Sequence, residues 1–366
     1  MFSNIVGQEL VKKVLGGAIR QDRLSGSYLF FGPEGVGKWA TALEVAKILN
    51  CQEGKSAPCG NCPSCKKITN LIHPDIKLLF PLPSVKNEEE KERFNKEKIG
   101  EPYSIVGFSR SSNIPVEEIR QLQKELSLRP FEAKRRVVII YQAERMASSG
   151  ENSLLKTLEE PPLDAILIMI CSEQGKLLPT ILSRCQKIRF SSLSDNSIEN
   201  YLKSKCQLDS AKAGFYSKIS RGSLGKAISL IDSEGGQIRE DGVNLIFSAL
   251  SQDLCSVVMR VQELIAQYDR DSILEMFDFL FTLFRDIYLY LGKQDHSNLL
   301  NLDLKSKIAE LAGFFKNSHI AEKGMNLISQ TKEDCVKRNA NLELSLLAMA
   351  LNWRGWSRRH LCQKYI

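Results

Sequence analysis

Two different hydrophobic patterns divide the chain near residue 190. Before it, short continuous apolar runs alternate with stretches in which apolar residues recur every three or four positions, as expected for buried parallel strands joined by helices. The runs lie at residues 28–31, 137–140, 165–170 and 187–190. From residue 191 onward the runs disappear, and leucine-rich faces with helical spacing extend over residues 240–355. The pattern predicts an α/β domain with a parallel sheet, followed by helical domains.

Two interruptions indicate how the chain is divided. A charge run from Glu88 to Lys98, followed by a stretch containing Gly, Ser and Pro, is interpreted as a solvated insertion or flexible loop at about 84–113. The sequence Glu-Gly-Gly at 234–236 is typical of a linker. We therefore predict a first domain at 1–190, a small helical domain at 191–236 and an all-α domain at 237–366.

The segment after the first predicted strand has the Gly-x4-Gly-Lys spacing of a phosphate-binding P-loop. Its glycines let backbone N–H groups surround a phosphate, and the following helix and the lysine add positive potential. The candidate nucleotide-binding residues are Gly32, Gly35, Gly37 and Lys38. Trp39 stands where a Mg²⁺-binding Ser or Thr is expected, and Tyr141-Gln142 stands where P-loop ATPases carry acidic residues. We expect no ATP hydrolysis, while ATP or ADP binding without turnover and a loop that binds nothing both stay open.

Four cysteines follow the predicted P-loop helix with the spacing Cys51-x7-Cys59-x2-Cys62-x2-Cys65. Proline and glycine between them force tight turns, which direct backbone N–H groups at the sulfur atoms. Four thiolates can surround one tetrahedral Zn²⁺ and leave no position open for chemistry, so the spacing predicts a structural zinc site. His73, just downstream, is interpreted as an ordinary surface or turn residue.

The amino-acid composition excludes few classes of function. The chain has 366 residues, a net charge of +7 and 43% hydrophobic residues, which is typical of a mildly basic globular protein. The most apolar run, residues 273–291, is interrupted by four charged residues and therefore predicts a buried helix rather than a membrane span. The sequence opens with no secretory leader, so we expect a cytoplasmic, reducing location and no membrane partner.

The C-terminal residues form a basic and aromatic tail. Contact with nucleic acid and the preference of a helix end for cations explain this tail equally well. The tail contains Trp353, Arg354, Trp356, Arg358, Arg359, His360 and Lys364.

Taken in order, several short motifs resemble the clamp-loader branch of the AAA+ ATPases, in particular the delta-prime group of bacterial DNA polymerase III. The P-loop and the four-cysteine module belong to this ordered set. The other members are Val6-Gly7-Gln8-Glu9, Leu154–Pro162, Ser183-Arg184-Cys185 and Asn339–Leu344.

The resemblance implies an AAA+ P-loop domain with an inserted zinc module, a small helical lid and an all-α collar domain that joins a five-subunit ring. The implied partners are gamma/tau and delta subunits, and through them the sliding clamp and primed DNA. In such rings ATP lies between subunits, and Arg184 matches the arginine that reaches the neighbour's ATP as an arginine finger in trans.

The same comparison shows what this chain has lost. Besides the replaced metal ligands, Gly225 stands where ATP-hydrolysing relatives carry a lid arginine, although Ser172 matches the polar sensor residue. We therefore predict a non-hydrolysing subunit that helps load the sliding clamp during DNA replication. One alternative is an ATP-hydrolysing gamma/tau-type subunit. Another is a zinc-containing DNA-binding module on an AAA+ scaffold.

Overall fold

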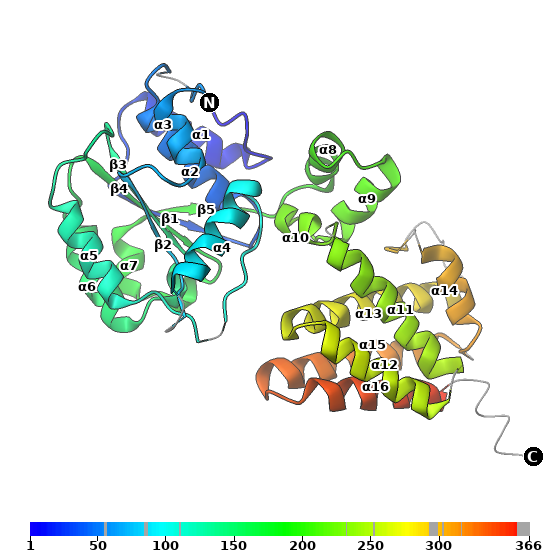
Figure 1. Cartoon of the computed structure of the whole chain (residues 1–366). Coiled ribbons are helices and arrows are strands. Elements are labelled where there is room, and N and C mark those ends of the chain that lie inside the picture. The colour runs from blue at the N-terminus through cyan, green and yellow to red at the C-terminus, as the bar shows by residue number, and fades with distance from the viewer. Residues whose placement is uncertain are drawn as a thin grey trace, which may run out of the picture. The chain divides into compact units, whose positions relative to one another are not determined.

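The computed structural model of the chain consists of two compact units, Met1–Ser229 and Leu230–Ile366 (Figure 1). The second begins seven residues before the predicted boundary at 237. The structure describes residues 1–54, 57–83, 87–109, 111–231, 233–251, 253–292, 299–301, 304–315 and 317–356.

A five-stranded parallel sheet with the order β2-β3-β4-β1-β5 forms the centre of the first unit. Its strands are β1 (Ser27–Phe31), β2 (Ile76–Leu79), β3 (Arg136–Tyr141), β4 (Ala165–Cys171) and β5 (Gln186–Arg189). Every residue of β3 and β4 is buried, as expected for inner strands of a sheet covered on both faces. The four predicted strands are confirmed, while β2 was not predicted.

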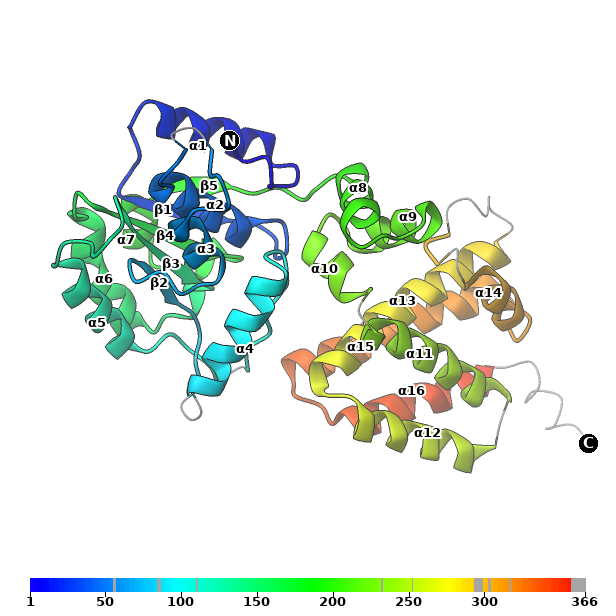
Figure 2. The same cartoon turned by 45° about the horizontal axis from the view of Figure 1, so that its top comes forward.

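Helices cover both faces of this sheet (Figures 1 and 2). One face carries α2 (Lys38–Asn50) and α3 (Pro63–Thr69). The other carries α5 (Val116–Leu126), α6 (Ser148–Glu159) and α7 (Pro179–Arg184), whose apolar side chains pack on β3 and β4 in one hydrophobic core. Helix α1 (Glu9–Arg20) precedes β1, and two short 3-10 helices, η1 (Ala143–Arg145) and η2 (Gln174–Lys176), follow β3 and β4.

Three short helices complete the first unit: α8 (Asp195–Lys205), α9 (Ser210–Ile219) and α10 (Leu224–Ser229). The first two begin with side-chain caps, because Ser194 accepts the N–H of Ser197 and Asp209 accepts the N–H of Lys212. We refer to α8, α9 and α10 as the lid.

The charged insertion is not the flexible loop that we predicted, because residues Asn87–Gly100 form helix α4. Glutamates occupy its first turn and a lysine its last turn, which suits the helix dipole. Arg93 forms ion pairs with Glu90 and Glu97 one turn away. Phe94 and Lys98 are buried, so α4 packs on the first unit through one face.

Helices are the regular secondary structure of the second unit over its described residues. Its helices are α11 (Ser233–Ser251), α12 (Leu254–Gln267), α13 (Arg270–Leu291), α14 (Lys305–Ala312), α15 (Ser318–Lys337) and α16 (Leu342–Trp356). Helices α13 and α15 run side by side and contribute to one hydrophobic core, in which the rings of Phe284 and Trp353 lie 5.1 Å apart. Gly324 allows this close packing, since a Cβ there would lie 2.3 Å from Phe284 Cδ1.

Two further predictions concern the edges of the second unit. The predicted linker at 234–236 is wrong, because these residues lie in the first turn of α11. Most of the basic tail, residues 357–366, lies outside the described residues, and Trp353 belongs to the core. None of the helices that the structure describes has both the length and the apolar character needed to cross a membrane.

Candidate functional site

The loop between β1 and α2 has the backbone shape of a P-loop. Its glycines all have positive φ angles: Gly32, Gly35 and Gly37. At Gly35 an added Cβ would lie 2.4 Å from Ser223 Oγ and 2.8 Å from Gly225 N. The lid therefore rests directly on the loop, where Gly225 donates its N–H to Gly35 O (3.0 Å) and Ser223 Oγ donates to Glu34 O (2.8 Å).

Lys38, the predicted phosphate-binding lysine, is bonded to its own loop. Its side chain is buried, and Nζ donates to the carbonyl oxygens of Gly32 and Pro33. Burial lowers the pKa of Lys38 to about 8, although Glu34 and other nearby acidic groups act in the opposite direction. The ammonium is thus directed at backbone carbonyl groups.

Side chains of this chain fill the space in front of the loop. The buried Trp39 ring meets Phe94 edge to face at 5.3 Å and Tyr141 edge to face at 5.8 Å. Tyr103 lies over Gly37, where an added Cβ would be 2.9 Å from its Cε1 atom. The space that remains is about 20 Å³, whereas pockets for small-molecule ligands are about 300–1,000 Å³. A nucleotide therefore does not fit unless these side chains move.

Two of the residues that fill this site, Lys98 and Tyr103, were not predicted from the sequence. Lys98 and Tyr103, from α4 and the segment after it, line the remaining space together with Trp39 and Tyr141. The sequence signal that could have indicated packing here is the set of aromatic residues within and on both sides of the charge run, at positions 80, 94, 103 and 108. In the structure Phe80 stacks on Phe94 with ring centroids 4.0 Å apart.

The positions that carry acidic residues in P-loop ATPases lie at the end of β3. Gln142, the second of them, is buried in a left-handed conformation. Ser172, the predicted sensor residue, follows β4 and donates its N–H to Glu144 Oε1 (2.8 Å) and its hydroxyl to Glu34 Oε1 (3.3 Å). Ser172 thus binds one oxygen of each of these two carboxylates, whereas the other oxygen of Glu144 is buried without a hydrogen-bond partner among the described residues.

Arg184, the last residue of α7, lies apart from the side chains that line the chain's own P-loop. Its Nε donates to Glu159 Oε1 (2.8 Å), Nη2 donates to the same oxygen, and Nη1 donates to Thr180 O (2.9 Å). Both members of the ion pair are partly exposed, at 30% for Arg184 and 48% for Glu159. The guanidinium is thus oriented at the surface between the ends of α6 and α7.

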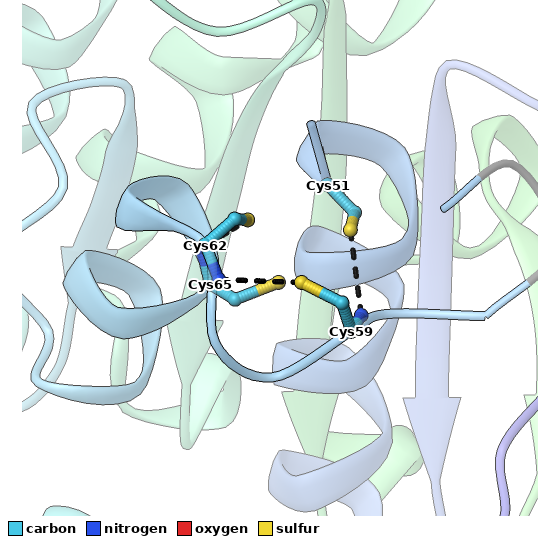
Figure 3. A group of neighbouring side chains, drawn as sticks. All are labelled: Cys51, Cys59, Cys62 and Cys65. Atoms are coloured by element: carbon cyan, nitrogen blue, oxygen red, sulfur yellow. Dashed lines mark hydrogen bonds between the residues drawn. The ribbon is translucent and has the colours of Figure 1, made fainter. Parts of the chain in front are cut away.

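The four predicted zinc ligands come together where α2 ends and α3 begins (Figure 3). Their sulfur atoms all lie within 4.8 Å of one another. Backbone N–H groups point at three of the sulfurs: that of Cys59 lies 3.4 Å from Cys51 Sγ, that of Cys62 lies 3.2 Å from Cys59 Sγ, and that of Cys65 lies 3.4 Å from Cys62 Sγ. The turns between the cysteines therefore aim donors at sulfur, as predicted.

This arrangement fits a tetrahedral metal ion. With Zn–S bonds of about 2.3 Å, neighbouring sulfurs of a tetrahedral site are about 3.8 Å apart, so small shifts would complete the site. Burial raises the pKa of Cys51, but the N–H groups of Cys59 and Gly54 outweigh it and bring the pKa to about 6. Burial raises the pKa of Cys65 to about 12, so this thiol needs a cation nearby to ionise.

His73 lies at a turn, as predicted, because its carbonyl oxygen accepts the N–H of Ile76 (3.1 Å), but it is not at the surface. It is buried beside the cysteine module, with Nδ1 accepting the N–H of Asp75 (3.2 Å) and Nε2 lying 3.6 Å from a Glu132 oxygen. Burial lowers its pKa, while Glu132 acts in the opposite direction. Lys67 of α3 also binds Glu132, at 2.8 Å, and so connects the cysteine module to the loop before β3.

The family model and the sequence relatives both point to DNA polymerase III subunits. A family model described as "DNA polymerase III, delta subunit" matches residues 7–194, just over half of the chain. DNA polymerase III subunit delta′ of Bacillus subtilis is 36% identical over 195 residues, which are 53% of this chain and 51% of that protein. DNA polymerase III subunit tau of the same organism is 29% identical over 261 residues, 69% of this chain and 41% of that protein.

The match therefore spans about half the length of these relatives or less. Among solved structures, a DNA polymerase III gamma subunit-related protein from Thermotoga maritima aligns with a TM-score of 0.42 and 18% identity, over 94% of this chain and 98% of that one.

Proposed function

Because this chain belongs to the DNA polymerase III clamp-loader family, we propose that it is a non-hydrolysing subunit of the delta-prime type. In this proposal the first unit is an AAA+ module and the second a collar, and the chain joins gamma/tau and delta subunits in a five-subunit ring. The ring loads the sliding clamp onto primed DNA in the cytoplasm.

The observation that carries the proposal is the filled P-loop. Lys38 donates to the carbonyl groups of its own loop, and about 20 Å³ is left in front of it. Hydrolysis requires Mg²⁺ between the phosphates and its protein ligands, but aromatic rings occupy both ligand positions, at Trp39 and Tyr141. We therefore propose that the site neither hydrolyses nor binds ATP.

We further propose that Arg184 acts in trans on the ATP of a neighbouring subunit. Its partner Glu159 is about half exposed, and such surface pairs contribute only about 0–1 kcal/mol. A triphosphate carries more negative charge than one carboxylate and can accept two parallel N–H bonds from a guanidinium. Exchange of Glu159 for a neighbour's γ-phosphate therefore costs little.

The cysteine module is proposed to hold one structural Zn²⁺ through Cys51, Cys59, Cys62 and Cys65. When bound, the ion would crosslink the end of α2 to the start of α3 and leave no open coordination position. Its role would be to fix this corner of the first unit, because Lys67 of α3 and Lys134, which donates to Cys51 O (3.0 Å), both connect the module to the loop before β3.

The proposal is tested by steady-state ATP hydrolysis in a ring reconstituted with gamma/tau-type and delta subunits. Arg184→Ala should lower the rate at the one interface it serves by on the order of 10³, because it removes the charge that stabilises the transition state. Arg120→Ala, which removes an exposed arginine from α5, is the matched control and should leave the rate unchanged. Equal rates for Arg184→Ala and Arg120→Ala would refute the trans role.

A gamma/tau-type subunit is the second candidate, because the match to subunit tau of Bacillus subtilis covers more of this chain than the match to its subunit delta′. The isolated chain separates the two candidates. A delta-prime-type subunit should hydrolyse no ATP and bind no fluorescent ADP analogue in the presence of Mg²⁺. Turnover by the isolated chain would favour the gamma/tau type and would mean that the P-loop opens.

A further inference from the structure

Lys98 is a lysine buried inside the first unit. It lies in the last turn of α4, and its side chain is only 2% exposed. Its Nζ donates to Ser104 O and lies 4.7 Å from the ring centroid of Tyr141 and 5.6 Å from that of Trp39. Both distances are within the range in which an aromatic ring attracts an ammonium group.

These two rings occupy the positions at which a P-loop ATPase holds Mg²⁺. Trp39 replaces the hydroxyl residue after the P-loop lysine, and Tyr141 replaces the first acidic residue after the strand. Because an aromatic ring attracts cations through its face, the substitutions exchange one kind of cation site for another. The new occupant comes from the chain itself.

We propose that Trp39 and Tyr141 form a cation site for the Lys98 ammonium, and that residues 87–104 thereby act as an internal ligand that closes the P-loop. This ligand keeps the loop and the lid in one arrangement without nucleotide. The part of the proposal that concerns the ring rests on the proposed function, whereas the cation site stands on the geometry of this chain alone.

The segment after Lys98 extends this contact to the lid and to the N-terminus. The Tyr103 hydroxyl accepts the N–H of Val6 at 2.8 Å, and the Tyr103 ring meets Tyr201 of α8 at 5.6 Å. Tyr201 in turn donates its hydroxyl to Glu101 at 3.0 Å. In nucleotide-switched proteins the γ-phosphate and its metal hold mobile elements in place, and here residues 98–103 make comparable connections.

The charge of Lys98 depends on the groups that surround it. Burial lowers the pKa of Lys98 to about 7. The carboxylates of Glu97, Glu34 and Glu101 act against this effect, and Lys38 adds to it. The two ring faces also favour the ammonium form. Measurements at pH 6 therefore examine the charged side chain.

The test is hydrogen exchange of the isolated full chain at pH 6. Lys98→Met keeps the length of the side chain but removes its charge. The amides of Val6 and Gly225, which donate to the Tyr103 hydroxyl and to Gly35 O, should then exchange at least about tenfold faster than in the wild type. Lys96→Met removes an exposed lysine from the same helix and is the matched control, with no change expected. Lys98→Arg retains a cation that stacks on aromatic rings and should preserve most of the protection.

Two substitutions of the Tyr141 aromatic ring test the same proposal if Lys98→Met does not fold. Tyr141→Phe retains the ring face and should behave like the wild type, whereas Tyr141→Leu should lose protection of the Val6 and Gly225 amides. Protection that is the same in Lys98→Met and in Lys96→Met would overturn the cation site. Added Mg²⁺ and ADP should leave wild-type exchange unchanged, and increased protection would show that the loop is open to nucleotide.

These outcomes are independent of the clamp-loader activity. Loss of protection in Lys98→Met together with an unaffected Arg184→Ala ring would reject the trans role and retain the cation site. The opposite pair of results would reject the cation site and retain the proposed function.

Discussion

Restoring the hydroxyl residue of a functional P-loop should destabilise this protein without giving it a nucleotide site. Trp39→Thr removes a buried ring that contacts Phe94, Tyr141 and Lys98. Replacing a buried Trp by a small residue costs about 3–5 kcal/mol, because the surrounding side chains relax only partly into the space left behind. A unit of this size loses about 2–4 °C of Tm per kcal/mol, so the transition of the first unit should fall by about 6–20 °C.

Differential scanning calorimetry measures this shift, and titration with a fluorescent ADP analogue in Mg²⁺ measures binding. Trp356→Thr makes the same chemical change at a partly exposed ring near the end of α16 and should have a much smaller effect on Tm. We expect no ADP binding by Trp39→Thr, since Tyr141, Lys98 and Tyr103 still fill the site. A variant that binds ADP and keeps its Tm within about 2 °C would refute the reasoning, because Trp39 would then be a dispensable remnant.

Two further predictions concern the stability of the first unit. The wild type should contain about one zinc per chain by elemental mass spectrometry, and Cys59→Ser should lose most of this zinc. The control Cys255→Ser changes an exposed cysteine of α12 and should keep the wild-type zinc content. Wild-type zinc content in Cys59→Ser would contradict the site. Asp75→Asn should lower the free energy of unfolding, measured in urea, by about 3–5 kcal/mol. The reason is that buried Arg136 loses its carboxylate partner, whose Oδ1 lies 3.3 Å from Arg136 Nη2. Asp22→Asn, in a surface pair with Arg135, should lower it by at most about 1 kcal/mol. Burial raises the pKa of Asp75, but hydrogen bonds from the N–H groups of residues 131–133 and from Arg136 outweigh it, so the net pKa lies below its ordinary value of 3.8. The stabilisation by the Asp75 carboxylate is therefore full above about pH 4 and is lost as the pH falls through the folded-state pKa. Asp75→Asn should therefore lose less stability in acid than the wild type. An equal loss of stability in the wild type and in Asp75→Asn would contradict this assignment.

The sequence predicts those parts of the fold in which the local residue pattern matches the position of the segment in the folded protein. The runs at 137–140 and 165–170 lie in the centre of the sheet, where both faces are covered and apolar residues are needed at every position. The four cysteines are close in sequence, so their spacing alone brings them together. The P-loop glycines likewise act locally, through the positive φ angles that they allow.

Helix α4 could not be predicted in this way. It buries little besides Phe94 and Lys98 over its whole length, so its sequence has no amphipathic period, and the charge run is typical of a solvated segment. Its position depends on contacts between residues that are far apart in the chain, such as Trp39, Phe94 and Tyr141. The pair of Arg184 with Glu159 depends in the same way on how α6 and α7 meet.

If Lys98 occupies the proposed cation site, it and a bound Mg²⁺ would exclude one another. An ammonium and a divalent cation about 4 Å apart repel each other by roughly 8 kcal/mol at an effective dielectric constant of 20. A carboxylate at position 141 would instead form an ion pair with Lys98, since Nζ lies 4.7 Å from the Tyr141 ring centroid. Restoring either metal ligand alone therefore leaves Lys98 in place of the metal. In the proposed cation site, Trp39, Tyr141 and Lys98 of α4 therefore depend on one another.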